Sequence, residues 1–128
     1  GCTHEIRTVS PTYTQLTPDG WLVSEFRRQA EKIGRAPMPP ELEGFRPLGS
    51  TDMGNVTNVL PGIHPVIGLD SGGSVTHQPE FAAACITESA DRAHVDGAIL
   101  LARTTVAAAV DVEARQRLLS GVEARAAR

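Results

Sequence analysis

The middle of the chain, GSTDMGNVTNVLPGIHP at residues 49–65, is polar where a domain of this length would normally place part of its core. It is bounded by glycine and proline, and SGGSVTHQPEF follows it at residues 71–81. Asparagine and aspartate in such stretches often stabilise turns by binding their own backbone, so Asp52 and Asn55 could be ordinary turn residues. What favours a functional site is the clustering of polar side chains, namely Ser50, Thr51, Asp52, Asn55, His64, Ser74, Thr76 and His77.

A helix is expected before this region, in DGWLVSEFRRQAEKIG at residues 19–34. Asp19 is a good N-cap and Gly34 stands at the usual stop position. Between them an apolar face recurs at helical spacing, formed by Leu22, Phe26, Ala30 and Ile33. The segment 35–48 holds four prolines and a glycine and is expected to be a surface loop.

Short strands are expected at HEIRTV (4–9), VTNVLPG (56–62) and HPVIGLD (64–70), where apolar residues alternate or run briefly between turn signals. Helices are expected at 79–89, starting at Pro79, at 91–112 and at 113–128. The long helix at 91–112 should bury Ile99, Leu100 and Val106. This order of elements favours an α/β fold over a helical bundle or a β-sandwich.

In α/β folds, ligands bind at the loops that follow the carboxyl ends of the strands, which is where the polar cluster is expected. His77 lies between a Gly-Gly turn and a helix that begins with proline, so its imidazole could bind a metal or transfer a proton. Gly72 and Gly73 are expected to adopt dihedral angles that other residues disfavour. His94 is expected at the surface or in a capping position. The four histidines show no metal-binding spacing, so the chain alone lacks a complete metal site.

Composition limits the partners and the compartment. The 128 residues fit one domain or part of a larger one, 41% of them are apolar, and the net charge of −3 argues against nucleic acid as a partner. No apolar run reaches the roughly 20 residues that span a bilayer. Cys2 and Cys85 lie far apart, which predicts no disulfide and a cytoplasmic location. The N-terminus has no initiator Met and no signal-peptide pattern, as if the chain were already in progress.

The stretch GSTDMGNVTNVLPGIHPVIGLDSGGSVTHQPEFAAA at residues 49–84 resembles the C-terminal segment of the M20 family of metallopeptidases and amidohydrolases. It is most similar to the branch of aminoacylase-like, p-aminobenzoyl-glutamate hydrolase-like and β-alanyl-lysine dipeptidase-like enzymes. The resemblance implies that residues 1–10 are the last strand of an inserted lid or dimerisation domain. Residues 11–128 would be the C-terminal portion of an αβα zinc-peptidase-like catalytic domain, equivalent to the final third of a full enzyme.

The resemblance also implies a site. Family members hold two divalent metals, usually zinc, and His77 matches the last metal ligand. Their H-x-D motif, Glu-Glu pair and general-base glutamate have no counterpart in these 128 residues, so the chain alone should be inactive. Thr51, Asn55, Gly72 and Gly73 would line the substrate side, while Asp52 and His64 would support the ligands or the loop.

The expected substrate is an N-acyl amino acid or a dipeptide-like amide, cleaved at its C–N bond. The expected partner is a second copy or the remainder of the same enzyme. The alternative is a non-catalytic domain that binds a small carboxylate or a partner chain.

Overall fold

The computed structural model describes residues 1–43 and 51–126, without the side chains of Glu43 and Ala126. The described part consists of helices and the segments that join them. The helices are α1 (Gly20–Lys32), α2 (Pro40–Glu43), α3 (Met53–Thr57), α4 (Pro79–Ala84), α5 (Glu88–Val110) and α6 (Val112–Ala126). The expected helices at 19–34, 79–89, 91–112 and 113–128 correspond to α1, α4, α5 and α6, but α4 ends at Ala84, α5 already begins at Glu88, and residues 127–128 lie outside the description.

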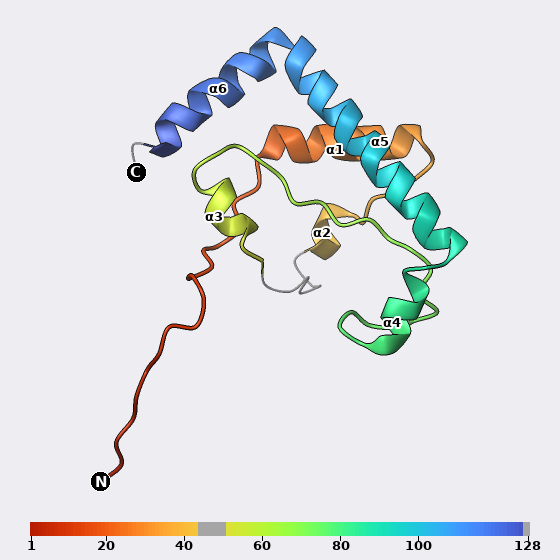
Figure 1. Ribbon diagram of the computed structural model, residues 1–128. Coiled ribbons are helices and arrows are strands. Elements are labelled where there is room, and N and C mark those ends of the chain that lie inside the picture. Colours follow the sequence, from red (N-terminus) through yellow and green to blue (C-terminus); the bar gives the residue numbers. More distant parts are fainter. Residues whose placement is uncertain (44–50, 127–128) are drawn as a thin grey trace.

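The long helix α5 organises the molecule, because α1 packs against it and α6 follows it at an angle (Figure 1). The chain bends between α5 and α6 at Asp111, whose side chain accepts a hydrogen bond from the Ala114 N–H at 2.9 Å. Residues 1–11 project as an exposed arm, and a long connection over residues 61–78 joins α3 to α4 (Figure 1).

The start and end of α1 follow from its sequence. The Asp19 carboxylate accepts hydrogen bonds from the Trp21 and Leu22 N–H groups, both at 3.1 Å, and so caps the helix. Gly34 follows the C-cap with a φ of +78°, a left-handed conformation that glycine adopts without steric cost. Both expectations for this helix are therefore confirmed.

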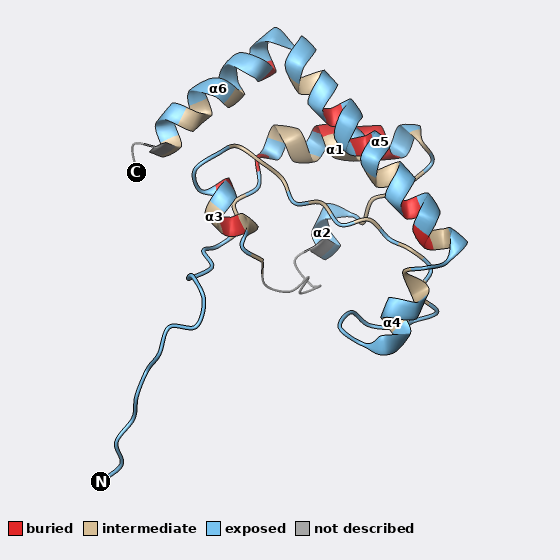
Figure 2. Ribbon diagram, viewed as in Figure 1, coloured by how far each residue is buried: buried red, intermediate tan, exposed pale blue. Residues whose placement is uncertain are grey.

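Most of the buried apolar residues are alanines, and buried residues gather where α1 crosses α5, with others in α3 and near the start of α5 (Figure 2). Leu100 is 1% exposed, and the other buried apolar residues are Ala30, Ala90, Ala93 and Ala114. Ile99 and Val106, which were expected to be buried with Leu100, are 38% and 59% exposed. The expectation was wrong because α1 contacts only one side of α5, and Leu100 and Thr104 occupy that side.

The described residues contain no β-strand, so the three expected strands do not form in this part of the chain. Residues 4–9 belong to the exposed arm, where no neighbouring segment pairs with them. Residues 56–57 lie in α3, followed by turns that the N–H groups of Asn58 and Leu60 close onto Gly54 and Val56. Residues 35–39 form no helix or strand, as expected of a loop, whereas Pro40–Glu43 is helical and residues 44–48 lie outside the description.

The third expected strand, 64–70, keeps one property of a strand. Half-buried and exposed residues alternate along it, with Pro65, Ile67 and Leu69 turned inward and His64, Val66 and Gly68 turned outward. Such a period of two is typical of a strand with one covered face. What is missing is a partner strand among the described residues. The α/β class of the fold consequently stays a prediction.

Helix α5 has 23 residues and is long and apolar enough, by length and composition alone, to cross a membrane. The sequence-based statement that no apolar run approaches this length therefore needs correction. Core helices of soluble proteins meet the same test, but such helices are mostly buried, whereas only 17% of the apolar window of α5 is buried. On one side α5 packs against α1 and pairs its Asp96 with Arg35 at 2.8 Å.

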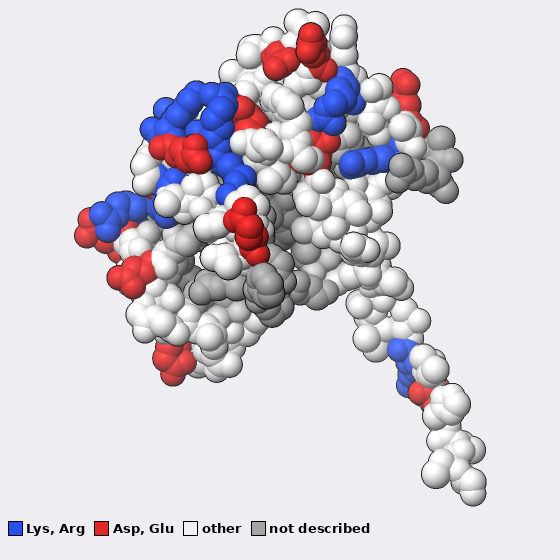
Figure 3. All heavy atoms as spheres, turned by 180° about the vertical axis from the view of Figure 1, so that it is seen from behind, with Lys and Arg blue, Asp and Glu red and all other residues white. Residues whose placement is uncertain are grey.

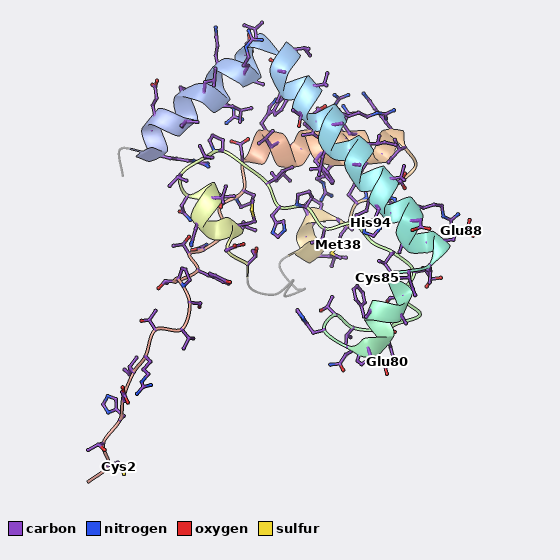
Figure 4. The ribbon with its side chains drawn as sticks, viewed as in Figure 1. Cys2, Met38, Glu80, Cys85, Glu88 and His94 are labelled. Atoms are coloured by element: carbon purple, nitrogen blue, oxygen red, sulfur yellow. The ribbon has the colours of Figure 1, made fainter. Side chains whose placement is uncertain are left out.

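Charged side chains of both signs are interspersed over the face shown in Figure 3. Two of the pairs are Arg28–Glu25 on α1 and Arg35–Asp96 between the α1 end and α5. Cys2 and Cys85 are both free, and Figure 4 shows them at distant points of the chain, which confirms that they form no disulfide.

Candidate functional site

The first part of the candidate site is the segment Thr51–Asn55, called the candidate loop below, which includes the first three residues of α3. The Thr51 hydroxyl accepts a hydrogen bond from the Met53 N–H at 3.2 Å, which shapes the start of the helix. Asp52 occupies the N-cap position, but its exposed carboxylate makes no capping hydrogen bond. Ser50 lies outside the described residues.

The Asn55 side chain, expected to contact substrate, binds a distant part of the chain. Its Oδ1 accepts hydrogen bonds from the Thr14 N–H at 2.9 Å and the Thr14 hydroxyl at 2.8 Å. Its Nδ2 donates to the Thr12 carbonyl at 3.1 Å. The amide is thus committed to residues 12–14, which precede α1.

Further side chains fasten α3 to the same segment. The Thr57 hydroxyl accepts from the Thr17 N–H, and the Thr17 hydroxyl donates to the Thr57 carbonyl, both at 3.1 Å. Asn58 Nδ2 donates to the Gln15 carbonyl at 2.8 Å and to the Thr14 hydroxyl at 3.1 Å. Thr57 is completely buried as a result.

Helix α6 holds α3 from its C-terminal end. The Arg125 guanidinium donates to the carbonyl of Thr57 at 2.7 Å and to the carbonyl of Leu60 at 2.6 Å. A cation at the C-terminal end of a helix pairs favourably with the unsatisfied carbonyls there. The candidate loop is therefore attached to a segment that is anchored from two directions.

The second part of the candidate site is the turn at residues 70–77. The Asp70 carboxylate accepts a hydrogen bond from the Gly72 N–H at 3.1 Å, and the Ser71 hydroxyl donates to the Ser74 carbonyl at 3.0 Å. Gly72 and Gly73 have φ values of +59° and +83°, which confirms the expected unusual dihedral angles. Their expected contact with substrate stays a prediction.

His77 is the only residue other than glycine with a positive φ in the described part of the chain, at +65°. A side chain with a Cβ adopts this left-handed conformation rarely, because it costs about 1–2 kcal/mol. Residues held in this way concentrate at functional sites. The imidazole is exposed and stands just before α4, which begins with Pro79.

His64 borders a separate, largely apolar cleft of about 960 Å³ between α1, α5 and the extended connection. Val23, Phe26, Ile33, Ile67 and Leu100 line its apolar part. At the edge, Arg35 binds Asp96 and donates to the Gly68 carbonyl at 2.7 Å. Arg35 thus ties the connection to α5, and the charged groups at this edge of the cleft already bind each other.

The two parts of the candidate site lie at opposite ends of the connection, one beside α3 and one beside α4 (Figure 1). Ten residues of extended chain reach roughly 30 Å, so the connection is long enough to separate them widely. The described structure therefore brings Thr51, Asp52 and Asn55 together, and separately Gly72, Gly73 and His77, but does not unite the two groups.

The residues present do not by themselves form a metal centre. No group of three or more His, Cys, Asp or Glu side chains in the described part of the chain could hold a metal ion. His94 lies exposed on α5 and joins neither part of the site (Figure 4), as expected of a surface residue. His77 alone would supply one ligand of the three or four that zinc requires.

Sequence reasoning missed the residues that hold the loop, namely Thr14, Thr17, Asn58 and Arg125. Their partners lie 40 to 68 positions away along the chain, as in Thr17–Thr57 and Arg125–Thr57. No local sequence pattern predicts such pairs, because the periodicities of helices and strands concern residues that are close together in the sequence. The one usable signal was the unusual density of threonine and asparagine in 12–17 and 51–58.

Comparison with known proteins relates the chain to dipeptidases. It is 33% identical over 124 residues to the Xaa-Arg dipeptidase of Mus musculus and 31% identical over 122 residues to that of Homo sapiens. Each alignment covers 95% of this chain but 27% of the relative, so the chain spans about a quarter of the length of these proteins. No family model matches the chain. No solved structure matches it either.

Proposed function

We propose that the chain is part of a metal-dependent peptidase or amidohydrolase of the M20 type. The reaction would be hydrolysis of the C–N amide bond of a dipeptide-like substrate or an N-acyl amino acid. The observation that carries this proposal is the similarity to two dipeptidases along 95% of the chain. By this proposal the chain would be the C-terminal part of an α/β catalytic domain preceded by one strand of a lid domain.

Amide hydrolysis requires a polarised carbonyl, an activated water molecule and a held substrate. In the proposed enzyme the candidate loop and the turn at residues 70–77 border the substrate, and Gly72 and Gly73 allow the backbone to approach it closely. His77 supplies one ligand to the divalent metals, zinc by resemblance, which would polarise the amide when bound. Its left-handed backbone supports this assignment, because such strain is retained where function needs it.

The remaining ligands and the general base come, in this proposal, from outside these residues. The described residues offer no group of three metal-binding side chains, which agrees with a shared site. Asp52 and His64 would support the loop and the connection rather than bind metal. Both are exposed in the described structure and so are accessible to further parts of the protein.

The test is His77→Ala in the full-length protein, with His94→Ala as the matched control. His94 is also an exposed histidine, on α5, outside the candidate site. His77→Ala should lose most dipeptide hydrolysis and at least one equivalent of bound metal, measured by elemental analysis. His94→Ala should retain both. Unchanged metal content and activity in His77→Ala would refute the ligand assignment.

A second candidate function is a non-catalytic domain that binds a small carboxylate or a partner chain. The absence of a metal-binding group among the described residues is compatible with both candidates and does not decide between them. The two candidates differ in the full-length protein. A protein that binds N-acyl amino acids but neither retains metal nor hydrolyses them would support the binding domain and exclude the enzyme.

A further inference from the structure

The segment 12–17, called the strap below, connects the exposed arm to α1 and is bound along its length by side chains of residues 55–58. The arm itself is exposed throughout residues 1–11 (Figure 2). Within the arm the structure describes an ion pair between Arg7 and Glu5, two residues apart. The strap is therefore the first segment after the arm that is held by hydrogen bonds to the rest of the protein, beginning with the contacts of Asn55.

The hydrogen bonds of Asn55 leave little capacity for a ligand. A carboxamide has two donor hydrogens and an oxygen with two lone pairs. The oxygen accepts two bonds from Thr14, and one Nδ2 hydrogen is given to Thr12. The orientation of the amide is fixed by these partners, since only the oxygen can accept from an N–H and only the nitrogen can donate to a carbonyl.

The contact between the strap and α3 is also a close backbone contact. A Cβ built on Gly54 would collide with the carbonyl oxygen of Thr14. Gly54 is buried there, although it belongs to a polar stretch. Glycine at this position thus allows the two backbones to touch, and the reciprocal pair of Thr17 and Thr57 closes the other end of the contact.

We propose that Asn55 is a positioning residue, which fastens the candidate loop to the strap and makes the position of the loop depend on the strap and on the arm before it. The proposal deepens the proposed function and rests on it in one respect, that the loop borders the substrate. It replaces a direct contact between Asn55 and substrate.

The decisive experiment compares three variants of the full-length protein in a dipeptide hydrolysis assay. Asn55→Ala removes all three side-chain bonds and should lower kcat/KM about 10- to 100-fold, mainly through kcat. Asn55→Asp keeps the oxygen that accepts from Thr14 but turns its second carboxylate oxygen toward the Thr12 carbonyl, which repels it, so this variant should recover part of the activity lost in Asn55→Ala. If Asn55 instead donates to a substrate carboxylate, the added negative charge makes Asn55→Asp worse than Asn55→Ala, and the proposal is overturned.

Thr14→Val provides an independent test, because it changes the strap instead of the candidate loop. It removes the hydroxyl that donates to Asn55 and should lower kcat/KM about 3- to 10-fold. The double variant Thr14→Val/Asn55→Ala should lose less than the product of the single effects, because both changes remove the same bond. Thr8→Val, in the exposed arm, is the matched control and should be silent. A silent Thr14→Val, or fully multiplicative effects, would overturn the proposal.

Amide hydrogen exchange separates this proposal from the proposed function. In the same full-length variants, the amides of residues 53–58 should exchange faster in Asn55→Ala and Thr14→Val than in Thr8→Val. If the wild-type protein hydrolyses no dipeptide, the proposed function fails, and faster exchange in these two variants still supports the fastening role. Unchanged exchange in both variants would show that the strap does not hold α3.

Discussion

At the scale of single residues, Asp19 connects the start of α1 to α6. Its carboxylate caps α1 and also accepts hydrogen bonds from Arg117 of α6 at 2.8 and 2.9 Å. The hydrogen bond from Arg117 is the main cause that holds the pKa of Asp19 below its ordinary value, against the opposing effect of burial. Arg28 and Gln29 likewise keep the pKa of the buried Glu25 low, Arg28 contributing most.

The lowered pKa values of both carboxylates predict that the fold loses stability in acid. A carboxyl group whose pKa is lower in the folded state stabilises the fold above its unfolded pKa, and this stabilisation is lost as the pH falls through the folded pKa. The ordinary values of Asp19 and Glu25 are 3.8 and 4.5, so the free energy of unfolding should be constant above pH 5.5 and fall steadily below about pH 4.5. Urea unfolding between pH 7 and pH 3 measures this. A flat profile would contradict the assigned ion pairs.

Arg117→Met tests the contribution of Arg117. The change leaves the Asp19 carboxylate buried without its cation, and it should lower the free energy of unfolding at pH 7 by about 1–2 kcal/mol, a modest loss because Arg117 is half exposed. The pH dependence should flatten at the same time, since the pKa of Asp19 returns toward its ordinary value. Arg92→Met, which changes an exposed arginine of α5, is the control. Equal losses in both variants would show that the ion pair is irrelevant.

At the scale of elements, the contact of α3 with the strap depends on one glycine. Gly54→Ala places a methyl group against the Thr14 carbonyl, so α3 and the strap must separate. Overpacking of this kind costs about 1–3 kcal/mol, and the lost hydrogen bonds of Asn55 add to it. Urea unfolding should show the loss, whereas Gly68→Ala, where a Cβ meets nothing within 4 Å, should be nearly neutral. Similar stability of both variants would contradict the close contact.

The helices could be predicted from the sequence because their signals are local, as where Asp19 and Gly34 mark the limits of α1 and Pro79 opens α4. The caps formed by Thr87 and Asp111 at the starts of α5 and α6 were missed, because both residues fell inside the expected helices 79–89 and 91–112. Burial along α1 was harder to predict. Ala30 is buried as expected, but Glu25 and Gln29 are buried as well, because hydrogen bonds between their side chains and with Arg28 satisfy them.

Neither the pairing of the strands nor the contacts of the site residues could be predicted in the same way. Both depend on segments that lie far away along the chain. The sequence indicated a short apolar strand at 64–70, and the structure shows half-buried and exposed residues alternating there. Hydrogen-bonded pairing needs a second strand, however, and the described residues supply none. Thr51, Asp52 and Asn55 were assigned to a functional cluster, yet the structure engages Asn55, together with Thr57, with residues 12–17, some 40 positions away. The left-handed Gly72 and Gly73 were predictable, because glycine pairs mark such turns.

At the scale of the whole molecule, the core is small for a chain of this length. Leu100 is the one large apolar side chain that is fully buried in the described structure, and the other buried apolar residues are alanines. Meanwhile large apolar residues remain exposed along the connection and α5, including Val66, Val95, Val106 and Val110. A small core gives little free energy of folding, so the isolated chain should be marginally stable.

Leu100→Ala tests how much of the stability of the isolated chain depends on this core. Removing a buried leucine side chain costs about 2–5 kcal/mol, which is comparable with the whole stability of a marginal domain. The isolated chain carrying Leu100→Ala should therefore lose its cooperative thermal transition. Leu119→Ala, which shortens a leucine of α6 that is 63% exposed, should leave the transition in place. A cooperative transition retained by Leu100→Ala would show that the core lies elsewhere.

The exposed apolar surface of the isolated 128-residue chain should promote self-association. Residues 64–70 are extended and pair with no strand in the described structure, although Arg35 binds the Gly68 carbonyl and Ser89 binds the Asp70 N–H, and extended segments without a partner strand pair readily with another chain. We expect sedimentation velocity at micromolar concentration to show dimers or larger species, with dissociation on dilution. Val66→Lys, at a residue 64% exposed in this segment, should weaken association more than Val106→Lys, at a residue 59% exposed on α5, if strand pairing is the cause. The reverse order would assign association to the helix face, and a well-behaved monomer with sharp amide dispersion would contradict self-association altogether.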